Sequence, residues 1–180
     1  MLKGKEIVLG VSGGIAVYKA AELTRLLVKE GANVNVIMTK NAQEFVTPLT
    51  FQTLSGNPVP AELFDLSRRS EVKHVSLAEK SDLLIIAPAT ANIIGKIASG
   101  IADDLLTTTV MATRSPIIIA PAMNVLMWKN TIVQENIKKL KKLRFKFVEP
   151  GTGYLACGYE GKGRLAEPEA ILKKIKALLK

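Results

Sequence analysis

The sequence predicts a doubly wound α/β domain, which is a mainly parallel sheet with helices on both faces. The strand candidates 83–87 and 117–120 are apolar throughout, without polar alternation. Such strands are buried on both faces, as in a parallel sheet covered by helices. Helical patterns alternate with these strand candidates, which is typical of β-α-β units. Because the 180 residues contain no low-complexity linker, we expect a single domain over residues 1–180.

The expected elements follow one another along the chain. Apolar runs predict strands over residues 7–11, 34–38, 83–87, 117–120 and 146–148. Helical spacing of apolar residues predicts helices over 16–30, 45–54 with a break near Pro48, 71–81, 90–99, 105–112, 130–143 and 166–180. Residues 60–69 are expected to form a loop-like connection, with a short strand inside it as the alternative. The segment 149–167 contains five glycines and predicts a loop able to close over a ligand, rather than a helix or a stable strand.

A glycine-rich turn, Ser12-Gly13-Gly14, links the first strand to the first helix. The turn lacks the G-x-G-x-x-G spacing and no acidic residue follows the second strand, so it is not a dinucleotide-binding fingerprint. It is not a P-loop either, because Gly-Lys-Ser/Thr is absent. Amides at a helix N-terminus can still bind one phosphate, and Thr39 adds a hydroxyl from the next strand tip. A mononucleotide such as FMN therefore fits better than NAD. The alternative is that the glycines only make a tight turn.

Two strands are each followed by Ala-Pro-Ala and then by an asparagine, Asn92 or Asn124. The carboxyl ends of parallel strands meet at one edge of the sheet, where ligands bind in open α/β folds. Asparagine both donates and accepts hydrogen bonds. We therefore expect a binding site at this edge, with the two strand tips close together.

The net charge of +9 raises the question of nucleic-acid binding. Lysines concentrate in 138–146 and 173–180, where they alternate with Ile and Leu at helical spacing, so we expect solvated basic faces of two amphipathic helices and no nucleic-acid partner. A nucleic-acid surface is the alternative, but aromatic residues make up only 5% and offer few stacking platforms. No apolar run reaches the ~20 residues of a membrane span, so we expect no membrane partner.

The sequence has one cysteine, Cys157, and one histidine, His74. A lone cysteine excludes multi-cysteine metal sites, so we expect no metal, and it is typical of a reducing, cytoplasmic setting. Within a glycine-rich segment Cys157 is either a functional thiol or a small buried hydrophobe. His74 is compatible with a functional or a structural role.

Five motifs carry a family resemblance: SGGIAVYK (12–19), His74 with Leu77, APATAN (87–92), PAMNVLMW (121–128) and ACGYEGKGR (156–164). In order and at compatible spacing, they resemble the homo-oligomeric flavin-containing cysteine decarboxylase family. PAMN and ACG together are specific, whereas the glycine turn alone is not. The resemblance implies the Rossmann-like flavoprotein fold, FMN as cofactor, and a cytoplasmic enzyme that decarboxylates 4′-phosphopantothenoyl-L-cysteine to 4′-phosphopantetheine in coenzyme A biosynthesis.

The resemblance also implies the course of the reaction and the cofactor site. Flavin oxidation would give a thioaldehyde, CO2 would leave, and the resulting enethiol would be reduced again, so the reaction is redox-neutral. The cofactor-binding residues would be Gly13, Gly14, Ile15 and Thr39 at the phosphate end of FMN, and Thr90, Ala91, Asn92 and Ala122 around the rest.

Three catalytic residues are implied in the same way. His74 would be the base that assists oxidative decarboxylation, Asn124 would hold the substrate carboxylate, and Cys157 would donate a proton in the reductive step. Neutral contacts from Asn124 suit a carboxylate that must leave as CO2, because a strong cation would stabilise its charge. For the substrate phosphate our candidates are Lys162 and Arg164; the alternative is that they are solvated loop cations.

Other activities of the same fold remain alternatives: a peptidyl-cysteine decarboxylase, a flavin prenyltransferase, or a non-catalytic flavoprotein that regulates a phosphatase. The resemblance implies a homo-oligomer, either a trimer or a dodecamer of trimers, and a phosphopantothenate–cysteine ligase as a fused or separate partner. Met127 and Trp128 are candidates for the subunit contact or for ordinary core.

Overall fold

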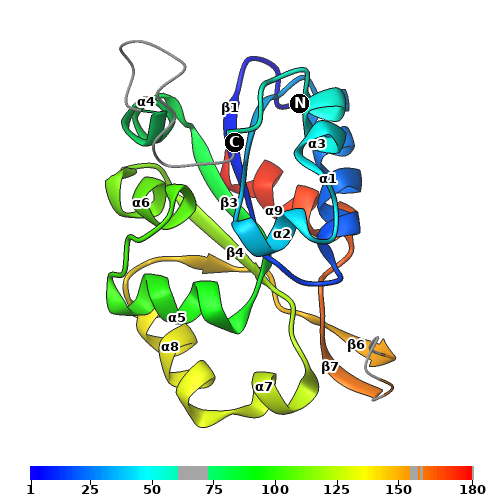
Figure 1. The fold of residues 1–180 in the computed structure, drawn as a ribbon, viewed down its shortest axis with the longest axis vertical. Coiled ribbons are helices and arrows are strands. Elements are labelled where there is room, and N and C mark those ends of the chain that lie inside the picture. Colours follow the sequence, from blue (N-terminus) through cyan, green and yellow to red (C-terminus); the bar gives the residue numbers. More distant parts are fainter. Residues whose placement is uncertain (61–72, 155–157, 159, 180) are drawn as a thin grey trace.

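The core of the fold is a five-stranded parallel sheet, which confirms the predicted α/β class (Figure 1). The computed structural model describes residues 1–60, 73–154, 158 and 160–179. The strand order is β2-β1-β3-β4-β5. The bounds are β1 Glu6–Val11, β2 Asn33–Met38, β3 Leu83–Ala89, β4 Ile117–Pro121 and β5 Lys146–Phe147.

Helices cover both faces of this sheet, as a doubly wound fold requires. Helices α1, α3 and α9 pack on one face, and α5, α6 and α8 pack on the other. The bounds are α1 Val17–Lys29, α2 Lys40–Gln43, α3 Pro48–Ser55, α4 Lys73–Lys80, α5 Ala91–Ser99, α6 Leu105–Ala112, α7 Val125–Lys129, α8 Thr131–Lys142 and α9 Pro168–Leu178.

The two-sided burial explains why the strands are apolar without alternation. Along β1, Ile7 and Leu9 belong to the core beneath α1 and α9, whereas Val8 belongs to the core on the opposite face. All seven residues of β3 are buried. Each side chain of a central strand therefore meets apolar neighbours, whichever face it points to.

Several boundaries differ from the sequence-based expectation. β3 continues two residues beyond Ala87, through a cis Ala87–Pro88 bond and a register shift against β4. The predicted helix over 45–54 begins only at Pro48, and α2 and α7 were not predicted. Both are helices of five residues or fewer, too short to show a helical period. The predicted loop over 60–69 lies outside the described residues, apart from residue 60.

The prediction that 149–167 is a loop is wrong where the segment is described. β6 (Gly151–Tyr154) and β7 (Glu160–Arg164) form an antiparallel hairpin. Gly153 and Gly161 have φ values of 150° and 157°, which residues with a side chain rarely adopt. The glycines that argued against a strand therefore shape this one.

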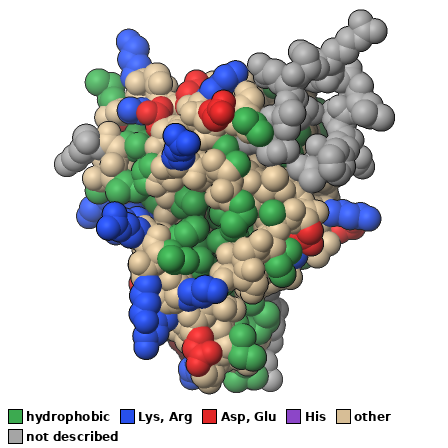
Figure 2. Space-filling view, turned by 90° about the vertical axis from the view of Figure 1, so that its left-hand side faces the viewer, with side chains coloured by type: hydrophobic (Ala, Val, Ile, Leu, Met, Phe, Trp, Pro, Cys, Tyr) green, Lys and Arg blue, Asp and Glu red, His purple; other side chains and the backbone are tan. Residues whose placement is uncertain are grey.

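The surface combines basic side chains with exposed hydrophobic ones. On the face drawn in Figure 2, hydrophobic side chains gather near the middle and Lys and Arg side chains lie around them. Large hydrophobic residues exposed on the molecule include Ile15, Leu49 and Leu126. Within the described part of the chain, no helix combines the length and the apolar character needed to cross a bilayer.

Candidate ligand site at the strand tips

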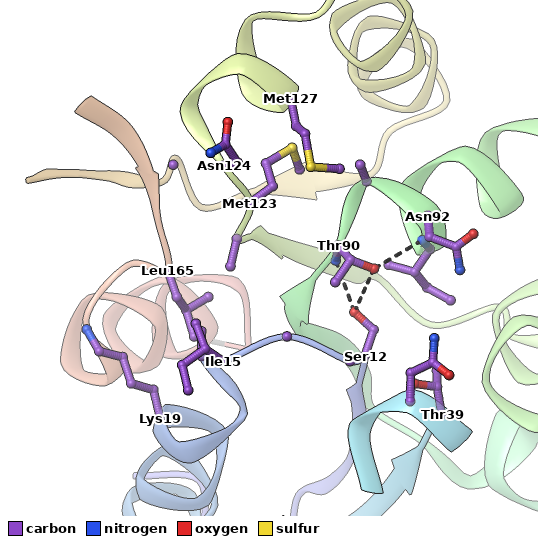
Figure 3. Close-up of a pocket in the computed structure, with 18 of the residues that line it drawn as sticks. Ser12, Ile15, Lys19, Thr39, Thr90, Asn92, Met123, Asn124, Met127 and Leu165 are labelled. Carbon is purple, nitrogen blue, oxygen red and sulfur yellow. Dashed lines mark hydrogen bonds between the residues drawn. The ribbon is translucent and has the colours of Figure 1, made fainter. Parts of the chain in front are cut away.

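A cavity of about 770 Å³ lies at the carboxyl edge of the sheet, and its volume is within the usual range for small-molecule sites. Figure 3 shows Met123, Asn124 and Met127 along one side, and Ser12 and Thr39 along the other. The walls come from the turn after β1, the tip of β2, the starts of α1 and α5, the loop before α7 and the end of the β6–β7 hairpin.

The tips of β3 and β4 are neighbours, as the repeated Ala-Pro-Ala sequence predicted. Ala89 pairs with Pro121 across the two strands, and the Ala122 amide donates to the Ala89 carbonyl at 3.0 Å. Asn92 and Asn124 follow these tips, and both line the cavity. The parallel topology thus brings two amide side chains, 32 residues apart in sequence, to one site.

Ser12 fixes the glycine turn to the tip of β3. Its hydroxyl lies 2.8 Å from the Pro88 carbonyl, and the Thr90 amide donates to Ser12 Oγ at 3.0 Å. Thr90 in turn caps α5, because its Oγ1 accepts from the Ile93 amide at 3.4 Å. The turn and the N-terminus of α5 therefore form one hydrogen-bonded unit along the floor of the cavity.

The floor also presents polar groups that have no hydrogen-bond partner among the described residues. Thr39 Oγ1 is buried and has no hydrogen-bond partner among the described residues, and the same residues supply none for the amides of Gly13 and Gly14. A Cβ atom at Gly13 would lie 2.5 Å from Asn41 Cβ and 2.7 Å from its backbone carbon. Only glycine lets the turn come this close, and the donors that result suit a ligand that carries phosphate oxygens.

Asn124 stands at the N-terminus of α7. Its Oδ1 accepts from the Leu126 amide at 2.7 Å and so caps the helix. Capping fixes the orientation of the amide at the wall of the cavity.

The hairpin is attached directly to the loop that carries Asn124. The Met123 amide donates to the Gly163 carbonyl at 3.0 Å. Lys162 lies with its ammonium 5.4 Å from the centre of the Trp128 ring, and a Cβ at Gly161 would come within 2.9 Å of Val125 Cγ2. β7 is thus seated tightly on α7.

The two candidates for binding a substrate phosphate lie in different surroundings. Arg164 lines the cavity, whereas Lys162 is not among the described residues that line it. Lys162 donates to Glu149 at 2.9 Å, and Lys141 donates to the same carboxylate. Hydrogen bonds from Lys141 and Lys162 lower the pKa of Glu149.

Lys19 is a buried charged residue at the edge of the cavity. Only 9% of its side chain is exposed, and its ammonium donates to both carboxylate oxygens of Glu167 at 2.8 and 2.7 Å. This hydrogen bonding lowers the pKa of Glu167, and the charge of the nearby Arg164 adds to the effect.

The remaining predicted site residues are placed as follows. The cavity is lined by all eight residues predicted for the cofactor, namely Gly13, Gly14, Ile15, Thr39, Thr90, Ala91, Asn92 and Ala122. His74 belongs to α4, which packs on α6, but its side chain lies outside the described part of the structure. Cys157 lies outside the described residues altogether. Trp128 is buried, whereas Met127 is exposed and lines the cavity.

Sequence reasoning missed Ser12 and Lys19 as residues of the site. Ser12 stood within the recognised glycine turn, and a short side chain at that point of a turn is a common hydrogen-bonding device. Lys19 lies three residues after Ala16 and four residues before Leu23, which places it on the same helical face as these two apolar residues. A lysine on an apolar face was the available signal that its charge has a buried partner.

Comparison with known proteins places the chain in a family. The Flavoprotein family matches residues 1–180. The chain belongs to the Flavoprotein family. Among its relatives in this family, the coenzyme A biosynthesis bifunctional protein of Bacillus subtilis strain 168 is 56% identical over 173 residues, which is 96% of this chain and 43% of that protein. The chain therefore spans less than half the length of that relative.

A relative of matching length also exists. The probable phosphopantothenoylcysteine decarboxylase of Streptococcus mutans is 44% identical over 177 residues, 97% of this flavoprotein chain and 99% of the relative.

Solved structures agree with the fold of this flavoprotein chain. A PPC decarboxylase mutant complexed with pantothenoylaminoethenethiol superposes with a TM-score of 0.85 at 31% identity, covering 96% of this chain and 97% of its own. The FMN-dependent cysteine decarboxylase SpaF superposes with a TM-score of 0.86 at 30% identity, covering 99% and 97%.

Proposed function

We propose that this chain decarboxylates 4′-phosphopantothenoyl-L-cysteine to 4′-phosphopantetheine with FMN as cofactor. The observation that carries the proposal is the meeting of Asn92, Asn124 and the glycine turn around one cavity. The bifunctional and decarboxylase relatives, at 56% and 44% identity, support the same activity. The peptide-directed decarboxylases of this fold are the competing activity, and the choice of substrate distinguishes them.

The cavity floor fits the phosphate end of FMN. Thr39 Oγ1 and the amides of Gly13 and Gly14 lack partners among the described residues, and phosphate oxygens would satisfy them. Thr90, Ala91, Asn92 and Ala122 then remain to surround the ring system. When bound, FMN supplies a hydride acceptor for the carbon that carries the substrate thiol, and returns the hydride later.

The residues of the chain orient the substrate and handle its protons. Asn124 binds the substrate carboxylate through a neutral amide, so the charge that must leave as CO2 is held without an ion pair. His74 acts as the base in the oxidative half of the reaction, and Cys157 gives a proton to the enethiol in the reductive half. Both assignments rest on the sequence motifs that contain these residues.

For the substrate phosphate we propose Arg164 rather than Lys162. Arg164 lines the cavity, and a guanidinium binds phosphate through paired N–H donors. Lys162 is engaged with Glu149 and Trp128 instead.

We also propose a homotrimer, alone or within a dodecamer, that works in the cytoplasm. The exposed hydrophobic residues Ile15, Leu126 and Tyr154 support a subunit contact near the cavity, because apolar surface of this kind is usually buried in an assembly. Relatives that carry both coenzyme A biosynthesis activities on one chain support a ligase partner, fused or separate.

The absorption spectrum of the purified protein tests the cofactor. We expect a flavin band near ~450 nm that denaturation releases as FMN. A colourless protein that does not take up added FMN would contradict the proposal.

The Cys157→Ser variant tests the reaction itself. We expect wild-type protein to convert 4′-phosphopantothenoyl-L-cysteine to CO2 and 4′-phosphopantetheine. The variant should still release CO2 but accumulate the enethiol, because the proton donor of the second half is missing. Mass spectrometry of the products separates the two outcomes. Formation of the saturated product by the variant would rule out the role of the thiol, and turnover of a peptide with a C-terminal cysteine in place of the small substrate would favour the competing activity.

A further inference from the structure

Lys19, Arg164 and Glu167 form a group of charges at one end of the cavity, which we call the Lys19 cluster. Lys19 Nζ donates to both oxygens of Glu167, at 2.8 and 2.7 Å. Arg164 Nη2 lies 3.7 Å from Oε1 of the same carboxylate. Lys19 and Arg164 line the cavity. One carboxylate is therefore shared unequally between two cations that border the site.

Lys19 holds the larger share of that carboxylate. Its side chain is 9% exposed, against 60% for Glu167. A charge taken out of water needs a partner, and Glu167 is that partner. Glu167 is also the N-cap residue of α9, but its side chain makes no capping bond to that helix. The carboxylate is directed toward α1 instead.

Arg164 is held loosely by comparison. A separation of 3.7 Å is beyond hydrogen-bond distance, and 41% of its side chain is exposed. Space beside the guanidinium depends on Gly153, because a Cβ there would lie 2.9 Å from Arg164 Nη1. Arg164 can thus meet an anion in the cavity without first breaking a strong bond.

We propose that Lys19 is a positioning residue that engages Glu167 and so keeps Arg164 available to the phosphate of the substrate. The inference rests on the proposed function, in which Arg164 binds that phosphate. With Lys19 present, the cluster carries two positive charges and one negative charge. Without it, Glu167 pairs with Arg164 and the cluster becomes neutral, so a dianionic phosphate loses both its donor and its favourable field.

This electrostatic role predicts opposite effects from the two ends of one ion pair. Lys19→Met should weaken phosphate binding, whereas Glu167→Gln should strengthen it, because Glu167→Gln removes the competing carboxylate. The double variant should return close to wild-type affinity. A purely structural pair predicts instead that both single variants act in the same direction, since each breaks the same bond.

The experiment uses the FMN-loaded protein and two probes that differ only in the phosphate. Calorimetry gives Kd for 4′-phosphopantothenate and for pantothenate, and steady-state assays give KM for the corresponding cysteine conjugates. We expect Lys19→Met to raise Kd for 4′-phosphopantothenate about fivefold and Glu167→Gln to lower it by a similar factor, in the range of partly exposed ion pairs. Neither should change Kd for pantothenate, and Lys19→Arg should retain wild-type affinity.

A second ion pair between the same two helices provides the control. Lys176 Nζ on α9 lies 2.7 Å from Glu30 Oε1 at the far end of α1, and neither residue lines the cavity. Lys176→Met should leave both dissociation constants unchanged.

Each possible failure has a distinct signature. If Lys19→Met and Glu167→Gln both weaken the binding of 4′-phosphopantothenate and of pantothenate by the same factor, Lys19 has only a structural role and the inference is wrong. If wild-type protein binds 4′-phosphopantothenate and pantothenate with the same Kd, the Lys19 cluster does not bind the phosphate. That result overturns the inference but leaves the proposed decarboxylase activity intact. If wild-type protein turns over neither cysteine conjugate, the proposed function itself fails.

Discussion

Asn124 combines a structural and a proposed chemical task in one side chain. Its oxygen caps α7 by accepting from the Leu126 amide at 2.7 Å, and the residue lines the cavity. The cap holds an uncharged amide in a fixed position at the wall of the cavity. It also allows the two tasks to be separated by substitution, because aspartate caps helices as well as asparagine does.

We expect Asn124→Asp to lower kcat/KM about tenfold or more near neutral pH. A carboxylate at position 124 repels the substrate carboxylate, and tenfold corresponds to ~1.4 kcal/mol. The melting temperature should hardly change, because the α7 cap survives. Steady-state kinetics and thermal unfolding of the same preparation check both statements, and unchanged kcat/KM would count against carboxylate binding by Asn124.

At the residue scale, the sequence predicted which residues line the cavity better than it predicted the contacts between them. The strand-tip residues followed from topology, since parallel strands end at one edge. Lys19 was not predicted, because a helical lysine is usually solvated and its partner Glu167 lies 148 residues away. No local pattern encodes a contact of that separation.

At the scale of elements, the β6–β7 hairpin is the piece that differs most from expectation. Glycine-rich sequence normally argues against strands, because glycine loses much conformational freedom on folding. Here the glycines permit backbone angles and close contacts that a side chain would forbid. The long apolar strands were predicted because each carries a signal in its own residues. The short helices α2 and α7 were not, since neither is long enough to show a period.

Gly161→Ala tests whether the hairpin must sit tightly on α7. The added Cβ would meet Val125 Cγ2 at 2.9 Å and Cγ1 at 3.1 Å, so β7 has to move away from α7. We expect turnover to fall several-fold while the flavin absorbance of the purified protein is retained, because neither residue lines the cavity.

A compensating change makes this test specific. Val125→Ala removes both methyl groups that the new Cβ meets, so the double variant should recover part of the lost turnover. Recovery is only partial, because alanine at 161 must still adopt a φ of 157°. Absence of any recovery would show that the contact with Val125 is not what limits Gly161→Ala.

At the scale of the whole molecule, the sheet determines which distant segments can cooperate. The chain runs β1, β2, β3 in sequence, but β1 lies between β2 and β3. That order brings the glycine turn next to the tip carrying Thr90 and leaves Thr39 on its other side. The apolar runs indicate the five strands of the main sheet, and their alternation with helices indicates the parallel sense, but the strand order arises from packing that no single segment contains.

The start of the sheet is held by a carboxylate whose effect on stability depends on pH. Asp82 accepts from the Glu6 amide at 2.8 Å and from Lys5 Nζ at 2.9 Å. These bonds, the amide first and the ammonium second, lower the pKa of Asp82 below its ordinary value of 3.8. Because the folded-state pKa is the lower one, this contribution is complete above the ordinary value and is lost as the pH falls through the folded value.

We therefore expect Asp82→Asn to lower the melting temperature at about pH 6, with the gap to wild type narrowing as the pH approaches ~3. Thermal unfolding between about pH 6 and ~3 measures this difference in melting temperature. Lys176→Met serves as the control, because it leaves Asp82 unchanged. A gap that stays constant with pH would show that the ionised carboxylate is not what stabilises this corner of the sheet.

The main-chain bond from Met123 to Gly163 has a consequence for engineering. It ties the Pro-Ala-Met-Asn loop to β7, so we expect these two segments to be transplanted best together. A designer who moves the loop alone onto a scaffold that lacks this strand would leave the Met123 amide without its acceptor. Chimeras that exchange both segments together should therefore be more stable than chimeras that exchange only one of them.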